Sequence, residues 1–423
     1  MKRDKCIVCS DHLYIDSVII GDQYPSAVFT YENEDYRQFL EPSSLNIAKC
    51  SNSSCGLVQL SSHYNLDMVF NNYPYVSSTT ATMKSILKNV VDEGVKVANL
   101  GKNDVVLDIG GNDGTMMSYL NTNVAYKINM DAAHGIESVP VSGNYKKIVG
   151  LFSSDAYNRL ELSRPKLIFC VAMFYHLDNP RQFCDEVASI MSNESVWVIQ
   201  MTYLKTMLED NIYDNVVHEH NAYYSMHSLE YLLKLSGLHI CGARIVESYG
   251  GSMRVYVKKR PERIVFNDLY NEYVRIKELE NKTEINTNKA LELFNERIKL
   301  LKQSSYNLIQ DIIESQGKIV ALGASTKGNM ICQFVGIGSD HIKCVLDNNI
   351  KKIGKVMTGS NIPVVDEKEW LNRLPKYLLV LPYYYVEHFV KMVSSNTKKG
   401  KITFIIVLLP VPKLIKVRGK NNE

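Results

Sequence analysis

The chain has 423 residues, of which 45% are hydrophobic and 22% are charged, and its formal net charge is +3. This length exceeds what one hydrophobic core supports and predicts two or three domains. The near-neutral charge speaks against nucleic acid as a partner, because nucleic-acid-binding proteins carry a strongly basic face. Residues 1–6 lack the apolar run of a signal peptide, and the apolar stretch 404–409 is too short to cross a bilayer. With cysteines that are mostly scattered singly, we expect a cytoplasmic protein without a membrane partner.

Residues 1–66 contain short alternating segments and two cysteine pairs, Cys6/Cys9 and Cys50/Cys55. Two such pairs can close a tetrahedral zinc site, and a segment with little core of its own gains stability from a metal cross-link. Four thiolates leave no open coordination position, so we expect structural rather than catalytic zinc. The alternative is four unrelated cytosolic cysteines. The favoured interpretation is a zinc-binding domain over residues 1–66.

Strand-like and helix-like segments alternate between residues 67 and 260. A helical pattern over 80–100 comes first, with apolar residues at helical spacing. We predict the strands 104–109, 126–131, 165–172, 195–201, 245–247 and 254–258. We predict the helices 114–120, 180–192 and 227–236. Such alternation is typical of a parallel sheet with helices on both faces, and the last two strands are expected at an antiparallel edge.

Residues 261–423 form the third predicted domain. The charged stretch 261–316 has few helix breakers and predicts one or two long helices. A second α/β unit follows, with strands expected over 319–322, 342–347, 377–381 and 402–409 and a helix from 330. The fold class is therefore α/β, with a small zinc-binding domain, a central Rossmann-like domain and a C-terminal Rossmann-like domain.

A glycine-rich turn, Gly110-Gly111-Asn112-Asp113-Gly114, follows the strand that contains Asp108. In an α/β sheet such a turn lets the backbone approach a ligand at the carboxyl end of a strand. The turn lacks the Gly-x-Gly-x-x-Gly spacing of a dinucleotide site. Its pattern is nearer to that of S-adenosylmethionine (SAM) methyltransferases, in which an acid after the next strand, here Asp131, holds the ribose hydroxyls. The alternative is a turn used only for packing.

Three histidines and a glutamate follow two of the predicted strands. His176 comes after strand 165–172, and His218, Glu219 and His220 come after strand 195–201. A histidine of near-neutral pKa is a suitable general base, and a neighbouring carboxylate can orient it. A metal site is the other functional interpretation, but His218 and His220 alternate, which sends them to opposite faces of an extended segment. The remaining alternative is that each histidine is a hydrogen-bonded core residue.

Three blocks of the sequence resemble the sugar C-methyltransferase family, whose members act on nucleotide-linked keto-deoxysugars. The first block contains the two cysteine pairs and the run 55–60. The second contains the segments 73–78, 108–115, 217–220 and 250–254, together with His176. The third contains the segments 323–329 and 347–359.

The resemblance implies a SAM-dependent C-methyltransferase acting through an enolate, in which a base removes the proton beside a ketone. The favoured base is His220, and the other implied catalytic residues are Glu219, His176, His218 and Tyr75. The implied cofactor-binding residues are Tyr73, Ser77, Asp108, Gly110, Asn112, Asp113 and Asp131. The substrate, a dTDP-linked or other nucleotide-linked sugar, is expected to contact Lys327, Asn329, Asp347, Tyr224 and Arg254. Lys327 lies at a helix start, where phosphate binds well.

Four positions depart from the family pattern. Val217 stands where the family has a tyrosine that assists proton transfer, and Tyr249 where histidine is common. Gln200 replaces a glutamate, and Tyr384 lies where tryptophan is usual. A neighbouring tyrosine such as Tyr213, Tyr223 or Tyr224 can take over the missing role. Otherwise these departures leave open an O-methyltransferase on a nucleotide-linked sugar, or a non-catalytic nucleotide-binding relative.

Overall fold

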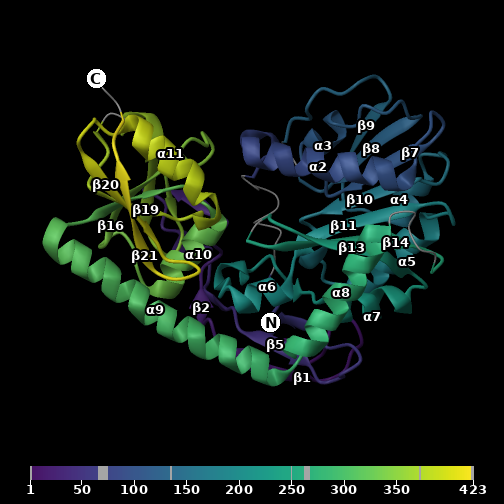
Figure 1. Cartoon of the computed structure of the whole chain (residues 1–423), viewed down its shortest axis with the longest axis horizontal. Coiled ribbons are helices and arrows are strands. Elements are labelled where there is room, and N and C mark those ends of the chain that lie inside the picture. Colours follow the sequence, from purple (N-terminus) through teal and green to yellow (C-terminus); the bar gives the residue numbers. More distant parts are fainter. Residues whose placement is uncertain are drawn as a thin grey trace.

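The computed structural model describes residues 2–64, 75–133, 136–248, 250–261, 267–370 and 373–420. Its strands form two small sheets and two large sheets, and helices cover the large ones (Figure 1). The α-helices are α2 (Ala81–Ala98), α3 (Thr115–Ser118), α4 (Ser154–Asn158), α5 (Pro180–Ile190), α6 (Leu204–Glu209), α7 (Met226–Leu235), α8 (Asn267–Thr283), α9 (Asn288–Gln316), α10 (Thr326–Val335) and α11 (Val386–Asn396). The predicted α/β fold class is confirmed.

The N-terminal residues build the two small sheets. The four-stranded sheet has the order β1-β5-β6-β12, formed by β1 (Leu13–Val18), β5 (Ile47–Cys50), β6 (Val58–Leu60) and β12 (Ala222–Tyr223). The two-stranded sheet pairs β2 (Asp22–Gln23) with β4 (Ser43–Ser44). Because β12 comes from the middle of the chain, the cysteine-containing segment is joined by main-chain hydrogen bonds to residues that follow His220.

The central sheet has seven strands in the order β13-β14-β11-β10-β7-β8-β9. They are β7 (Val105–Ile109), β8 (Tyr126–Asp131), β9 (Tyr145–Val149), β10 (Leu167–Val171), β11 (Val196–Thr202), β13 (His239–Val246) and β14 (Ser252–Lys258). The chain runs from β7 outward through β8 and β9, and then returns to the other side of β7 with β10 and β11. Ligands bind at such a switch point, at the carboxyl ends of the strands. The two last strands pair antiparallel, as expected.

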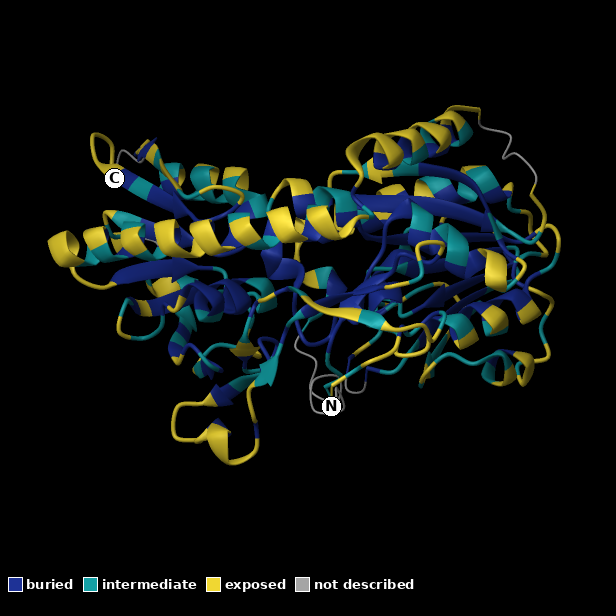
Figure 2. Cartoon of the chain, turned by 90° about the horizontal axis from the view of Figure 1, so that it is seen from below, coloured by how far each residue is buried: buried dark blue, intermediate teal, exposed yellow. Residues whose placement is uncertain are grey.

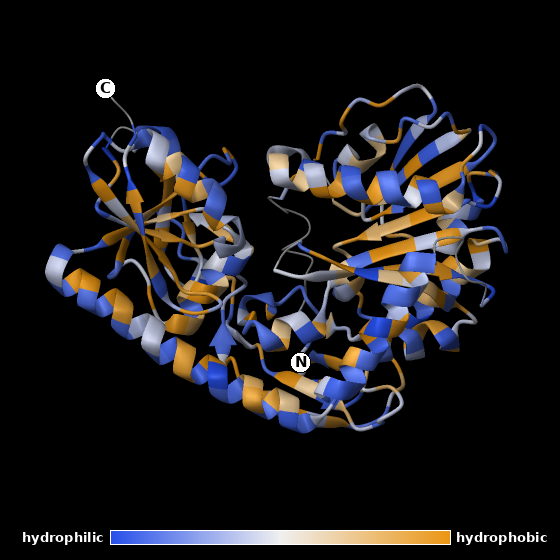
Figure 3. Ribbon diagram, viewed as in Figure 1, coloured by the Kyte–Doolittle hydropathy of each residue, from blue (hydrophilic) through white to orange (hydrophobic). Residues whose placement is uncertain are grey.

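The C-terminal sheet has eight strands in the order β21-β20-β19-β15-β16-β18-β17-β3. They are β3 (Phe29–Tyr31), β15 (Ile319–Leu322), β16 (Ile342–Asp347), β17 (Lys355–Met357), β18 (Ile362–Asp366), β19 (Tyr377–Val380), β20 (Ile402–Val407) and β21 (Lys413–Arg418). The order of the strands also switches sides here: the chain runs from β15 to β16, β17 and β18 on one side, and then returns to the other side of β15 with β19, β20 and β21. The strands of both large sheets are rich in hydrophobic residues (Figure 3).

The 29-residue helix α9 runs from the N-terminal sheet along the C-terminal one (Figure 1). One of its faces is exposed along its length (Figure 2), whereas Leu291, Phe294 and Ile298 are buried in a core shared with the C-terminal sheet. The predicted domain limits at residues 66 and 260 remain a prediction. Contacts are made across both limits. The strand β3, before residue 66, belongs to the C-terminal sheet, and the helix α8, after residue 260, packs on β13 and α7 of the central region.

Within the described ranges, no helix combines the length and the apolar character that a membrane crossing requires.

Candidate active site

The glycine-rich turn after β7 lies against the segment that follows β10. Gly110 has φ +74°, and a Cβ there would lie 2.8 Å from Cγ of Met173. A Cβ on Gly111 would lie only 2.2 Å from Oδ2 of Asp108. Side chains are thus excluded at both positions, and the backbone is left exposed to a ligand at the switch point.

Two acids with different surroundings flank this turn. The Asp131 carboxylate, at the end of β8, accepts the N–H of Asn112 at 2.8 Å and that of Ala133 at 2.7 Å. Asp108 is fully buried, and its Oδ2 has no hydrogen-bond partner among the described residues. Burial, reinforced by the charges of Asp131 and Asp113, raises the pKa of Asp108 well above its usual range. Asp131 is therefore the carboxylate that can meet polar ligand groups.

The segment before α2 closes over the turn. The N–H of Ser77 donates to Oδ1 of Asn112 at 3.0 Å, and Nδ2 of Asn112 donates to the carbonyl of Tyr75 at 3.2 Å. Asp113 accepts the N–H and the hydroxyl of Thr115 at the start of α3. The structure thus brings together Tyr75, Ser77, Asn112 and Asp113, four of the expected cofactor-site or catalytic residues, whereas Tyr73 lies outside the described residues.

His220 lies in a cluster of three rings. Its Nδ1 donates to the carbonyl of Asn215 at 2.7 Å, so in the neutral imidazole Nε2 carries the lone pair. The ring centroid lies 4.3 Å from that of Tyr175 and 5.3 Å from that of His176. Burial lowers the pKa of His220 well below its usual value, and lowers that of His176 to about 3. Both histidines are neutral at physiological pH, as a general base must be before it accepts a proton.

His218 and Glu219 face other surroundings. Nε2 of His218 donates to the carbonyl of Gln23 at 3.1 Å, and burial lowers the pKa of this histidine to about 4. Burial raises the pKa of Glu219 to about 7. His218 and His220 bond different elements, and the described groups of three or more potential metal ligands include neither. This arrangement favours bases over metal ligands.

The C-terminal unit reaches the same segment. Lys327, in the first turn of α10, hydrogen-bonds Oδ1 of Asn215, and its Nζ lies 5.5 Å from the ring centroid of Tyr384. The hydroxyl of Tyr383 donates to Oδ1 of Asp214 at 3.3 Å. Burial lowers the pKa of Lys327. Asn215, whose carbonyl accepts the hydrogen bond from His220, therefore also accepts a side-chain hydrogen bond from Lys327.

Two other expected substrate residues, Asp347 and Asn329, lie in the C-terminal unit and make hydrogen bonds there. Asp347 accepts the N–H of Ala324 and that of Asn349, each at 2.8 Å. Asn329 is fully buried and donates to the carbonyls of Ser26 and Thr358. Asp347 is half-buried at the carboxyl end of β16, whereas the amide of Asn329 ties the N-terminal segment to α10.

The structure does not bring Arg254 or Tyr224 to the site. The Arg254 guanidinium is 1% exposed and bonds Gln200, Glu93 and Asn89, so its donors stabilise the packing of α2 on the sheet. Tyr224 is buried in the core that contains the cysteine cluster.

Val217 is buried in the apolar core shared with the C-terminal sheet. The structure adds a tyrosine that the sequence motifs did not single out, Tyr175, whose ring contacts both His176 and His220. Its position directly before His176, in the 3₁₀ turn η3 (Phe174–His176), was the only available signal.

The four N-terminal cysteines meet as predicted. Their sulfur atoms all lie within 4.8 Å of one another, with Cys6 and Cys55 separated by 3.8 Å and Cys9 and Cys50 by 3.3 Å. Four sulfurs around zinc, each at about 2.3 Å, lie about 3.8 Å apart. A hydrogen bond from Cys55 lowers the pKa of Cys6 to about 6. The donor set fits a closed tetrahedral metal site.

Comparison with known proteins gives matches over most of the chain. Residues 83–241 match a methyltransferase domain family, and residues 247–410 match the C-methyltransferase C-terminal domain family. The C-methyltransferase NovU of Streptomyces niveus is 22% identical over 414 residues, which cover 97% of each chain.

Solved structures of methyltransferases match less than half of the chain at low similarity. The N-methyltransferase NodS of Bradyrhizobium japonicum WM9 is 13% identical, covers 44% of this chain and 99% of its own, and has a TM-score of 0.33. A SAM-dependent methyltransferase of Clostridium acetobutylicum ATCC 824 is 14% identical, covers 43% and 93%, and has a TM-score of 0.32. The two domain matches and the full-length relative carry the assignment: the chain is a SAM-dependent methyltransferase and belongs to the C-methyltransferase family.

Proposed function

We propose that this enzyme methylates the carbon beside the ketone of a nucleotide-linked keto-deoxysugar. The observation that carries the proposal is the fixed tautomer of His220, whose Nδ1 donates to the Asn215 carbonyl at 2.7 Å and thereby leaves Nε2 as a base. Family membership supports a carbon acceptor, and the similarity of three sequence blocks to sugar C-methyltransferases supports the sugar.

In the proposed reaction Nε2 of His220 removes the α proton, and the C–H electron pair becomes that of an enolate. SAM supplies an electrophilic methyl group. The enolate carbon forms the new C–C bond as the C–S bond breaks, and S-adenosylhomocysteine leaves. Tyr175 and His176, whose rings pack beside that of His220, are proposed to hold the enolate oxygen or the substrate. Glu219 and Tyr75 are proposed to complete the site, and His218 to support its wall.

For the cofactor, we propose that Asp131 binds the ribose hydroxyls and that the glycine turn meets the amino-acid end. Ser77 bonds Asn112, which also donates to Asp131, and Asp113 fixes Thr115 at the start of α3, so Ser77, Asn112 and Asp113 are proposed to shape the cofactor site. For the substrate, Asp347 and Lys327 are proposed to meet the nucleotide. Zinc is proposed at the four cysteines, where it would cross-link the N-terminal segment.

O-methylation is the second candidate, and Val217 favours it. An oxygen acceptor requires only a base and no group to stabilise an enolate, so it tolerates a core valine at that position.

Hydrogen exchange separates the two candidates. The enzyme is incubated with SAM or S-adenosylhomocysteine and dTDP-linked keto-deoxysugars in deuterated water. We expect deuterium at the α carbon, lost in His220→Ala and reduced in Tyr175→Phe, with Tyr377→Phe as a control on the distant β19. Methyl transfer to the sugar without α exchange would favour O-methylation, and absence of SAM binding would contradict both.

A further inference from the structure

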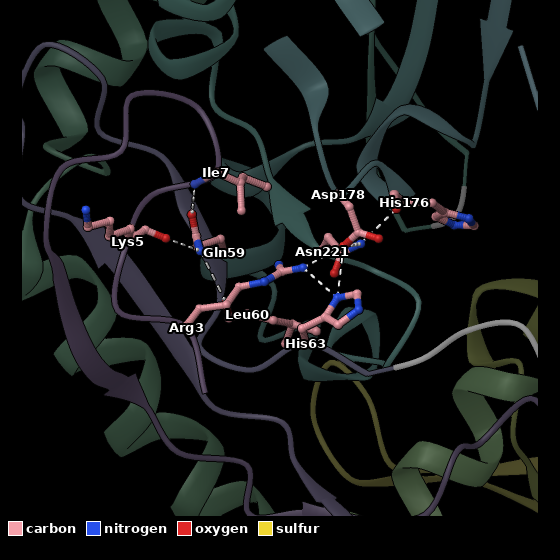
Figure 4. Close-up of polar contacts among 9 residues, drawn as sticks. All are labelled: Arg3, Lys5, Ile7, Gln59, Leu60, His63, His176, Asp178 and Asn221. Carbon is pink, nitrogen blue, oxygen red and sulfur yellow. Dashed lines mark hydrogen bonds and ion pairs between the residues drawn. The ribbon is translucent and has the colours of Figure 1, made fainter. Parts of the chain in front are cut away.

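Asn221, the residue after His220, links the active site to the N-terminal segment. Its Nδ2 donates to the carbonyl of His176 at 2.8 Å and lies 3.2 Å from Oδ1 of Asp178 (Figure 4). Its own carbonyl accepts the N–H of Leu60 at 3.0 Å. Asn221 is 1% exposed, so water does not readily replace these bonds.

The Leu60 strand is tied in turn to the first cysteine pair. Oε1 of the neighbouring Gln59 accepts the N–H of Ile7, between Cys6 and Cys9, at 2.9 Å. Its Nε2 lies 3.4 Å from the carbonyls of both Lys5 and Leu60. Figure 4 shows the contacts of Gln59 with Lys5, Ile7 and Leu60 beside those that join Arg3, His63, Asp178, Asn221 and His176.

A second connection passes through Asp178. Arg3 donates to its Oδ1 at 2.6 Å, and Nδ1 of His63 lies 3.1 Å from the same oxygen. The N–H of Arg3 donates to the carbonyl of Ser61 at 2.7 Å, next to Leu60. The loop that carries His176 is therefore held at His176 and at Asp178 by groups that the N-terminal segment supplies or fixes.

We propose that Asn221 is a positioning residue: it fixes His176 beside His220, and the N-terminal segment sets its position through Gln59, Leu60 and the Arg3–Asp178 pair. The N-terminal segment thereby acts on the reaction as well as on stability. The catalytic consequence rests on the proposed function, because it assumes that these two histidines serve the reaction. A displacement of about 1 Å at such a site can cost about a hundredfold in rate.

The first test replaces the amide donor by a carboxylate of the same size, which also adds a negative charge beside Asp178. Asn221→Asp keeps the size of the side chain but cannot donate to the His176 carbonyl. We expect kcat on dTDP-linked keto-deoxysugars to fall by about ten- to a hundredfold, with the affinity for S-adenosylhomocysteine unchanged. The matched control is Asn396→Asp, at the end of α11, whose Nδ2 also donates to a backbone carbonyl at 2.8 Å.

The second test reports on position without turnover. Histidine-labelled full-length protein gives the His176 imidazole resonances by NMR, assigned with His176→Gln. We expect these resonances to shift in Asn221→Asp and to shift less in Arg3→Met. In Arg3→Lys they should return towards their wild-type positions, and in Asn396→Asp they should not move. If Asn221→Asp does not fold, Arg3→Met, whose side chain is partly exposed, carries the test.

Unchanged His176 resonances in the folded variants would overturn the proposal, as would an unchanged kcat for Asn221→Asp. If the wild-type protein turns over none of the sugars, the proposed substrate fails, and the resonances alone decide the positioning role.

Discussion

Asp131 and Asp347 occupy equivalent places in the two large sheets. Each ends the strand next to the one that carries a glycine turn, and each accepts at 2.8 Å an N–H from that turn, of Asn112 and of Ala324 respectively. Each also accepts the N–H two residues further on, at 2.7 Å and 2.8 Å. The enzyme thus has two similar arrangements of an aspartate and a glycine turn, and their ligands can be tested separately.

Asp131→Asn is expected to weaken S-adenosylhomocysteine binding by about ten- to a hundredfold, because hydrogen bonds to a charged group contribute about 1.5–3 kcal/mol. Asp347→Asn is the matched variant and is expected to weaken dTDP binding instead. Calorimetric titration of each variant with each ligand measures both effects. Equal losses for both ligands in either variant would contradict separate sites.

The raised pKa of Glu219 predicts that its contribution to the free energy of unfolding depends on pH. Its pKa is about 7 in the folded protein, against an ordinary value of 4.5, so the folded state binds the extra proton between these values. Stability therefore falls as pH rises from about 4.5 to 7, by on the order of 3 kcal/mol relative to Glu219→Gln. Urea unfolding of both proteins across this range measures the difference, with the exposed Glu292→Gln as the control. A constant difference would show that the Glu219 carboxyl is not desolvated.

Val217→Tyr is expected to destabilise the protein by about 1–3 kcal/mol, because a larger side chain overpacks a filled core. Val217 is 1% exposed within that core. Denaturant unfolding measures the loss, and Val217→Ile, a smaller enlargement, should lose less. A stable tyrosine variant with faster methyl transfer would instead show that the position opens onto the site.

Cys6→Ser and Cys50→Ser are each expected to lose stoichiometric zinc, which metal analysis of the purified proteins measures. The melting temperature should fall with the metal, because the proposed zinc would cross-link the N-terminal sheet through these four sulfurs. Cys344→Ser, in β16 and outside the cluster, should retain the zinc content of the wild type. Full zinc occupancy in both cluster variants would refute the metal site.

Local patterns predicted most strands of the central sheet and half of those of the C-terminal sheet; they did not predict β9, β3, β17, β18 or β21, and they placed at 245–247 a strand that runs from His239 to Val246. Strand 126–131 and the strands near 104–109 and 195–201 were foreseen because short apolar runs between turn residues define them. The cysteine cluster was predictable for a similar reason, since spacing alone restricts how two pairs can meet.

The side-chain partners were not predictable in this way. Arg254 lies in a family-like motif, but its direction depends on Glu93 in a helix far away in the chain. Tyr175 became significant only when the folded chain brought His220 against it. Such contacts depend on tertiary packing, which a periodic pattern does not encode.

The pairing of β3 with β17 has a consequence for biosynthesis. Thr30 pairs with Val356, so the edge of the last sheet is completed by a strand from the beginning of the chain. At ~5–20 residues per second, a ribosome makes the partner strand tens of seconds after residue 30. During that interval the strand edge of residues 29–31 has no mate, and it is a natural place for a chaperone to bind the nascent polypeptide.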